Sequence, residues 1–241
     1  MACKICGNEK TIRCHLMPRA LMHDLRGVDP HLIAGGMHKF GVEKSQSGTW
    51  DDNLLCETHE RLLQESDRYG IQWIRRFAAK QETFVKDDIF LVPNERPELL
   101  LKFVCSIVWR HAMSRHCSDF DMDLGPWEIQ LRNLIFAKSN YNPLFVIAAK
   151  RWLIMSEKIG DVAFLPYRNP CFGKRGWEFE IGGLVWILIL DNRKSSKSFK
   201  IVSANGCNPV GVINTPDSEL VDRPGVIDIA VNMETRRNPL S

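Results

Sequence analysis

The strongest helical pattern in the chain runs from Glu57 to Lys80. Its apolar positions fall on one side of a helix, as in a helix that packs against a core: Leu62, Leu63, Trp73, Ile74 and Phe77. Gly70 predicts a bend near the middle of this helix. The other predicted helices lie at 19–26, at 97–117, and from Pro126 to about residue 137.

From residue 142 onward the pattern becomes extended, because short apolar and β-branched runs alternate with turn residues. These runs lie at 162–165, 177–181, 184–190, 199–202 and 226–231, and the run at 145–154 fits either a helix or a strand. The pair Gly182-Gly183 predicts a kink or a bulge. Nearer the amino end, short strands are predicted before His15 and before Cys56, with a long loop or irregular hairpin over 27–50 between them.

These patterns predict an α+β fold in two parts. The composition changes after Gln81, which favours an amino-terminal module over residues 1–85 and a carboxyl-terminal domain over 86–241. The second part is expected to be helical over 97–137 and rich in strands over 145–232. A chain of 241 residues has room for one large domain or two modest ones.

Composition and charge narrow the class of protein. Hydrophobic residues make up 44% of the chain and charged residues 25%, as in an ordinary globular protein. No apolar run approaches the length of a membrane span, and Cys3 and Cys6 interrupt the place of a signal peptide. The eight cysteines are spread along the chain, which favours free thiols in a reducing cytoplasm. The net charge of +3 is small, so any binding to nucleic acid requires a local basic patch.

The spacing of cysteine and histidine at the amino end predicts a metal site. Cys3 and Cys6 are separated by two residues, and Cys56 and His59 repeat that spacing farther along the chain. Three thiolates and one imidazole complete a tetrahedral zinc site with no open position, which makes the zinc structural. The alternative is a redox pair at Cys3 and Cys6, but such a pair usually follows a strand, and no strand is predicted before Cys3.

The residues around this site resemble the HNH, or ββα-metal, endonucleases, in a divergent bacterial subgroup that carries a zinc knuckle. Each pair of predicted zinc ligands, Cys3 with Cys6 and Cys56 with His59, forms a short turn called a knuckle. The resemblance lies in these two knuckles, in His15-Leu-Met-Pro18, in Asn53-Leu54, and in Glu60 directly after the second knuckle. It covers residues 3–65, about a quarter of the chain.

That resemblance implies an enzyme that hydrolyses phosphodiester bonds with one divalent ion, Mg²⁺ or Mn²⁺. His15 would be the general base, Asn53 would orient His15 or hold its loop, and Glu60 would bind the ion. Cys14 stands where these enzymes carry a metal ligand, and a soft thiol suits Mg²⁺ poorly.

Two further points concern the same residues. Asp51 or Asp52 would replace Cys14 as a ligand for the divalent ion. If the site has no catalytic role, His15 is instead a hydrogen-bonded histidine beside the zinc.

Four arginines provide the expected contact with nucleic acid. Arg61, Arg68 and Arg75 lie seven residues apart and so form a stripe on the predicted helix, which Arg76 extends. The stripe is either a phosphate-binding surface or an ordinary solvated helix face. DNA is the expected partner, ahead of RNA, together with a regulatory protein or a second copy of the chain. The resemblance also points to a cytoplasmic effector in phage defence or in a mobile element.

Two other functions fit the same sequence. A catalytically inactive zinc module would bind DNA or a protein partner without cutting it. Alternatively, the strand-rich part is a sensor or an assembly domain, and the amino-terminal module is its cap.

Overall fold

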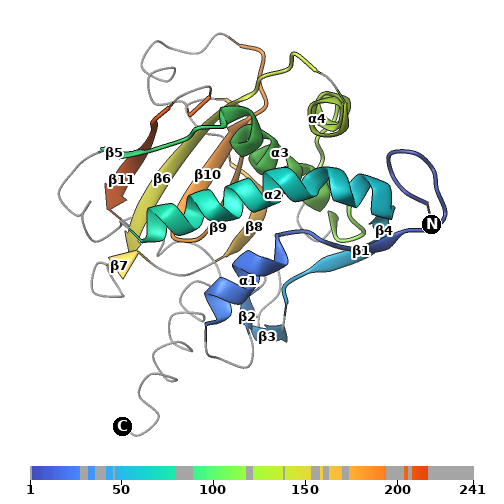
Figure 1. Cartoon of the computed structure of the whole chain (residues 1–241), viewed down its shortest axis with the longest axis horizontal. Coiled ribbons are helices and arrows are strands. Elements are labelled where there is room, and N and C mark those ends of the chain that lie inside the picture. The colour runs from blue at the N-terminus through green and yellow to red at the C-terminus, as the bar shows by residue number, and fades with distance from the viewer. Residues whose placement is uncertain are drawn as a thin grey trace, which may run out of the picture.

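The computed structural model of the chain describes residues 2–27, 32–35, 42–45, 47–79, 89–117, 122–137, 139–152, 158–159, 163–169, 174–193, 204–205 and 208–216. It confirms a mixed α+β architecture (Figure 1). The helices in these ranges are α1 (Arg19–Arg26), α2 (Glu57–Ala78), α3 (Pro97–Met113) and α4 (Trp127–Phe136). All of them were predicted, although α3 ends before the expected residue 117. The strands predicted at 199–202 and 226–231 lie outside the described residues.

A seven-stranded sheet, counted within the described residues, forms the larger layer of the molecule. Its order is β5 (Ile89–Val92), β11 (Val210–Pro216), β6 (Leu144–Trp152), β10 (Leu184–Ile189), β9 (Gly176–Ile181) and β8 (Phe164–Arg168), and β7 (Lys158–Ile159) pairs with β6. The pair of β11 with β6 is parallel, and the other described pairs are antiparallel. The ambiguous run at 145–154 is therefore a strand as far as Trp152, where the described part of it ends, whereas β5 and β11 were not predicted.

The two adjacent glycines form the turn between β9 and β10. Gly182 and Gly183 have φ values of 64° and 73°, and residues on either side of them pair as Leu184 with Ile181. Two successive positive φ values suit the two-residue hairpin turn whose twist matches antiparallel strands. The prediction of a kink or bulge here was wrong, since the glycines end one strand and begin the next.

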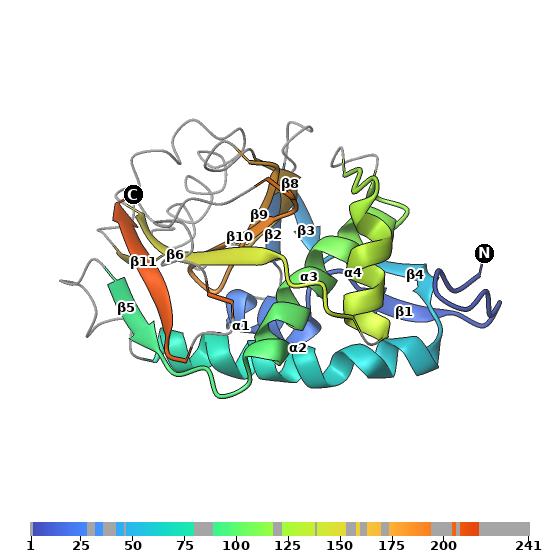
Figure 2. The same ribbon diagram turned by 90° about the horizontal axis from the view of Figure 1, so that it is seen from above.

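Helices α2 and α3 lie side by side on one face of the sheet (Figures 1 and 2). The indole ring of Trp186 in β10 contacts Trp73 of α2, with ring centroids 5.6 Å apart, and Phe103 of α3 at 5.8 Å. Helix α2 runs without interruption across Gly70, where the sequence predicts a bend. Among the described helices, none combines the length and the apolar character that crossing a membrane requires.

The amino-terminal segment forms its own small sheet against the start of α2. Strands β1 (Ile12–His15) and β4 (Trp50–Leu55) pair antiparallel, with His15 opposite Trp50, and α2 begins immediately after Cys56. Within the predicted loop or hairpin over 27–50, β2 (Leu32–Gly35) and β3 (Val42–Ser45) form an antiparallel pair.

One cluster of buried apolar residues runs from this segment through the helices into the large sheet. Leu54 of β4, Trp109 of α3 and Trp186 of β10 all belong to it. A domain boundary near residue 85 falls at residues outside the described ranges and stays a prediction.

Candidate functional site

The four predicted zinc ligands converge beside the first turn of α2. The donor atoms of Cys3, Cys6, Cys56 and His59 all lie within 4.8 Å of one another. The Sγ atoms of Cys6 and Cys56 are 3.8 Å apart, and His59 Nδ1 lies 3.2 Å from Cys56 Sγ and 3.7 Å from Cys3 Sγ. Tetrahedral zinc with usual bond lengths requires about 3.8 Å between two sulfurs and about 3.6 Å between sulfur and nitrogen. The cluster can therefore hold a structural metal such as zinc.

Local backbone structure explains why these ligands meet. The amide of Gly7 donates to Cys3 O at 2.9 Å, and the positive φ of Gly7, 73°, closes this turn. The amide of Lys4 donates to Leu54 O at 3.0 Å, which attaches the turn to β4. Cys56 is the residue that caps α2, and His59 follows on its first turn, so that both side chains lie on one side of the helix.

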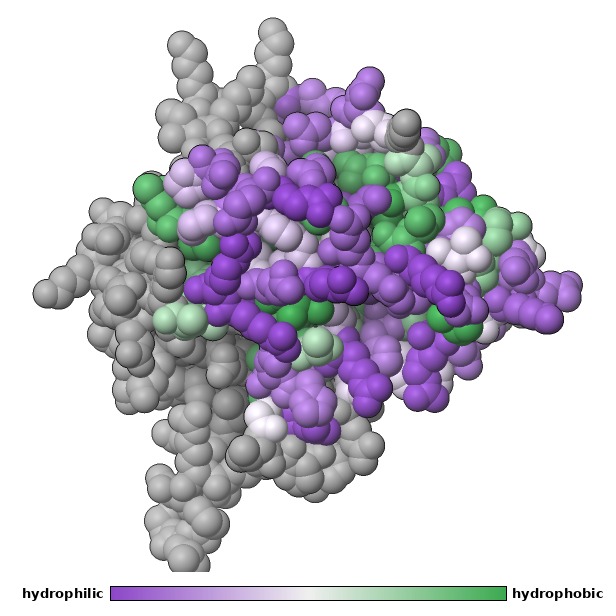
Figure 3. Space-filling view, viewed as in Figure 1, coloured by the Kyte–Doolittle hydropathy of each residue, from purple (hydrophilic) through white to green (hydrophobic). Residues whose placement is uncertain are grey.

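A pocket of about 600 Å³ lies next to this cluster, between β1, α1 and α2. One face of α2 lines it, with residues spaced three or four apart: Glu60, Gln64, Asp67, Arg68, Ile71, Gln72 and Arg75. His15 of β1, Arg19 of α1 and Arg110 of α3 also line it. His15 and Glu60, which are distant in sequence, therefore share one cavity, as the sequence predicts. The exposed side of α2 forms a hydrophilic band across this face of the molecule (Figure 3).

His15 is half-buried, and its Nε2 atom is buried without a hydrogen-bond partner. Burial lowers the pKa of its imidazole from the usual 6.5, and the charges of Arg19, Arg13 and Arg110 lower it further. The ring is therefore neutral at pH 7. A neutral imidazole nitrogen that has no hydrogen-bond partner is able to accept a proton.

Glu60 has one carboxylate oxygen, Oε2, that is also buried and without a partner. Burial raises the pKa of the Glu60 carboxyl, while the nearby Arg110 guanidinium and Cys14 thiol act to lower it. Burial raises the pKa of Cys14 well above its usual range, so that this residue is a neutral thiol. A protonated thiol is a hydrogen-bond donor and is neither a nucleophile nor a good metal ligand.

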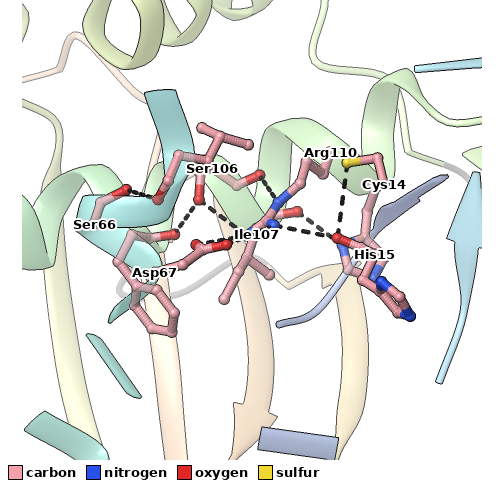
Figure 4. Close-up of polar contacts among 10 residues, drawn as sticks. Cys14, His15, Ser66, Asp67, Ser106, Ile107 and Arg110 are labelled. Atoms are coloured by element: carbon pink, nitrogen blue, oxygen red, sulfur yellow. Dashed lines mark hydrogen bonds and ion pairs between the residues drawn. The ribbon is translucent and has the colours of Figure 1, made fainter. Parts of the chain in front are cut away.

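Arg110 of α3 makes hydrogen bonds to β1, to α2 and to its own helix (Figure 4). Its two terminal nitrogens donate to both carboxylate oxygens of Asp67 at 3.0 and 2.9 Å. Nη1 also donates to His15 O at 3.2 Å, and the remaining donors reach Ser106 O at 3.3 Å and Ser106 Oγ at 3.2 Å. All five N–H groups of the guanidinium are therefore used within the protein. Arg110 holds the backbone of His15 and has no donor left for a ligand.

Asn53 and its acidic neighbours lie outside the pocket. The Asn53 amide nitrogen Nδ2 donates to Asp52 Oδ1 at 2.8 Å, so that in the described residues Asn53 makes no hydrogen bond to His15. Asp51 is buried and accepts the backbone amides of Asn53 and Arg115 at 2.8 and 2.6 Å. Asp51 therefore organises the backbone around β4, Asp52 binds the side chains of Asn53 and Arg115, and neither aspartate lines the pocket.

The predicted arginine stripe divides between two environments. Arg68 and Arg75 line the pocket, and Arg75 with Arg76 borders a second one of about 430 Å³ farther along α2. Arg61 lies outside both and forms an ion pair with Glu57 on the surface. The polar pocket residues that the predicted site did not include are Arg19, Gln64, Asp67, Gln72 and Arg110. Helical spacing from Glu60 identifies two of them, and a lone arginine within an apolar helix marks Arg110.

The fit of this pocket to a divalent ion rests on one oxygen. Glu60 Oε2 is a buried hard donor without a partner, whereas both oxygens of Asp67 are held by Arg110. Within the described ranges, one group of three or more His, Cys, Asp or Glu side chains is close enough together to hold a metal. That group is Cys3, Cys6, Cys56 and His59, outside this pocket. Mg²⁺ can bind through a single carboxylate and complete its shell with water and substrate phosphate, so Glu60 is the residue that would hold such an ion here.

Comparisons with protein-family models, curated proteins and solved structures find no match to this chain.

Proposed function

We propose that this chain is an HNH-like endonuclease that hydrolyses phosphodiester bonds in DNA. The observation that carries the proposal is the shared pocket of His15 and Glu60, each with a buried polar atom that has no partner. The order of two antiparallel strands followed by a helix, beside a zinc-type cluster, supports the same reading. A cytoplasmic role as a defence or mobile-element effector, under the control of a protein partner or of a second copy, belongs to the proposal through the resemblance alone.

The chemistry assigned to the residues is as follows. His15 removes a proton from a water molecule, which then attacks the phosphorus atom. Arg19 and Arg68, which line the pocket, neutralise the charge of the phosphate. A divalent ion held by Glu60, when bound, would stabilise the charge on the leaving oxygen. Arg110 keeps the His15 backbone in place while the reaction proceeds.

The test is cleavage of supercoiled plasmid by the zinc-loaded full chain with Mg²⁺ or Mn²⁺. His15→Ala should lower the rate by about a hundredfold or more, the usual effect of removing a general base. The matched control is His23→Ala, because His23 is an exposed histidine of α1 outside the pocket. The rate of the parent protein should fall as the pH drops through the lowered pKa of His15, below about 6.5, since protonation removes the base. Equal cleavage by the parent and His15→Ala would remove His15 from the mechanism.

A second candidate is a catalytically inactive zinc module that binds DNA. The observation in its favour is the single hard ligand, since Cys14 is a neutral thiol and Asp67 is held by Arg110. This candidate predicts measurable affinity for DNA and no cleavage with any divalent ion. Glu60→Gln separates the two functions, because it should abolish metal-dependent cleavage in an enzyme and leave binding unchanged in a binding module.

A further inference from the structure

The arginines near the pocket fall into two classes, those paired with a carboxylate and those without such a partner. The paired class consists of Arg61 with Glu57 at 2.5 Å, Arg75 with Asp24 at 2.7 Å, and Arg76 with Glu95 at 3.0 Å. The neighbouring carboxylate cancels the charge of a paired guanidinium, so that a phosphate is attracted to the pair less strongly than to an unpaired arginine. Three of the four residues of the predicted stripe therefore carry charge that is already compensated.

The unpaired class surrounds His15 and comes from three different elements. Arg13 lies on β1, Arg19 begins α1, and Arg68 lies on α2. All three side chains are exposed, and none forms an ion pair with a carboxylate in the described part of the chain. Arg19 and Arg68 line the pocket with His15, and Arg13 lies two residues before His15 on the same strand.

Trp50 supports the arginine of β1. It lies opposite His15 across the strand pair, and the Arg13 guanidinium is 4.2 Å from the centre of its ring. Stacking on an aromatic face orients a guanidinium and leaves its N–H groups free for a phosphate. Arg115 also lies over this ring, at 5.3 Å, but it donates to Asp52 at 3.2 Å and so belongs to the paired class.

We propose that Arg13, Arg19 and Arg68 form the phosphate-binding surface for a DNA backbone that passes over His15, with Trp50 holding Arg13 in place. The inference deepens the proposed function and rests on it for the identity of the ligand. Arginine binds phosphate through two parallel N–H groups, and the three unpaired guanidiniums have those groups available. The surface therefore differs from the stripe along α2 and shares only Arg68 with it.

Fluorescence anisotropy with a labelled DNA duplex, measured over a series of salt concentrations, tests this surface. The zinc-loaded full chain carries His15→Ala, so that cleavage does not interfere. One variant changes Arg13, Arg19 and Arg68 to Gln, and the other changes Arg61, Arg75 and Arg76 to Gln. Both variants lose three positive charges, and all six residues lie at the surface. Thermal unfolding curves verify that each variant is folded.

The first variant should lose about 30-fold or more in affinity at low salt, and its slope of log K against log salt should shrink by about 2 to 3, since each lost phosphate contact removes about 0.9. The second variant should lose less than about threefold. Equal losses in the two variants would overturn the proposed surface, and so would a parent protein without measurable affinity for the duplex. Selective loss in the first variant supports the surface even if the protein with His15 intact cuts no DNA. If the protein with His15 intact cuts DNA and the two variants lose equal affinity, the nuclease proposal holds and the proposed phosphate-binding surface is wrong.

Discussion

Arg110 is a fully charged side chain in the middle of a helix whose other residues are mostly apolar and buried. A buried charge is tolerated only where it is paired and its donors are satisfied. Here Asp67 supplies the opposite charge through a bidentate contact. Ser106 and the His15 carbonyl accept hydrogen bonds from the remaining N–H groups. Burial raises the pKa of Asp67 while the guanidinium lowers it, so that the carboxylate and Arg110 depend on each other.

Removal of Asp67 should therefore be costly. Asp67→Ala leaves the Arg110 charge buried and without its partner, which should lower the free energy of unfolding by about 3 kcal/mol, the lower end of the usual range because Asp67 is partly exposed. The control is Glu57→Ala, which removes an exposed partner of Arg61 and should cost about 0.5 kcal/mol or less. Chemical denaturation of both variants gives the comparison. Equal and small changes would show that the Arg110 pair does not stabilise the fold.

For single residues, the sequence predicts the metal ligands better than the residues that hold the pocket side chains in place. The four zinc-type ligands could be found because structural zinc sites take their ligands in closely spaced pairs. Asp67 and Arg110 are 43 residues apart and meet only because α2 and α3 pack together. Asn53 was expected beside His15, but the nearer Asp52 takes its side-chain amide. Local spacing carries no information on such contacts.

Among the elements, α2 depends on the close approach of α3 at Gly70. A β-carbon added to Gly70 would lie 2.4 Å from the Phe103 ring, well inside a normal contact. The sequence correctly predicts the helix from its apolar side, but it assigns the glycine to a bend. In the structure, Gly70 instead allows α2 and α3 to pack closely, because the ring of Phe103 occupies the space where a side chain would lie. Strands β5 and β11 were missed because their pairing partners lie far away in sequence.

Gly70→Ala tests this explanation. Alanine favours a helix over glycine by about 1 kcal/mol, yet overpacking against Phe103 should exceed that gain and lower the free energy of unfolding by about 1–3 kcal/mol. The matched experiment is the double variant Gly70→Ala with Phe103→Leu, in which the smaller side chain makes room for the new methyl group. A double-mutant cycle from denaturation curves should give a favourable coupling of about 0.5 kcal/mol or more. A stabilised single variant would show that the ring of Phe103 moves aside and would contradict the packing role of Gly70.

For the whole molecule, the zinc-type cluster and the large sheet belong to one connected structure. The ring of His59 contacts Phe136 of α4, with centroids 5.7 Å apart, and Phe136 contacts Trp109 of α3 at 5.1 Å. Loss of the metal would therefore loosen packing well beyond the amino-terminal turn. The α+β class was predictable from periodicity, whereas this connection was not, because it depends on how the helices pack.

Metal removal is the corresponding test. A chelator, or the substitution Cys6→Ser at the exposed ligand, should remove about one zinc per chain and lower the Tm by about 10 °C or more, because metal binding contributes to folding free energy. Cys117→Ser is the control, since Cys117 is a partly exposed cysteine outside the cluster. Zinc content by mass spectrometry and thermal unfolding measure the effect. A metal-free protein with an unchanged Tm would contradict a structural role for the cluster.

The hydrogen bond from Arg110 to the His15 carbonyl joins residues 95 positions apart in the chain. A gene fragment that encodes only the knuckle, the strand pair and the first helix would leave this donor behind. Recombination that moved such a fragment into an unrelated host would deliver the ligands for zinc without the support for the histidine. A gene segment that encodes the intact pocket must therefore include α3 and must extend at least to Met113.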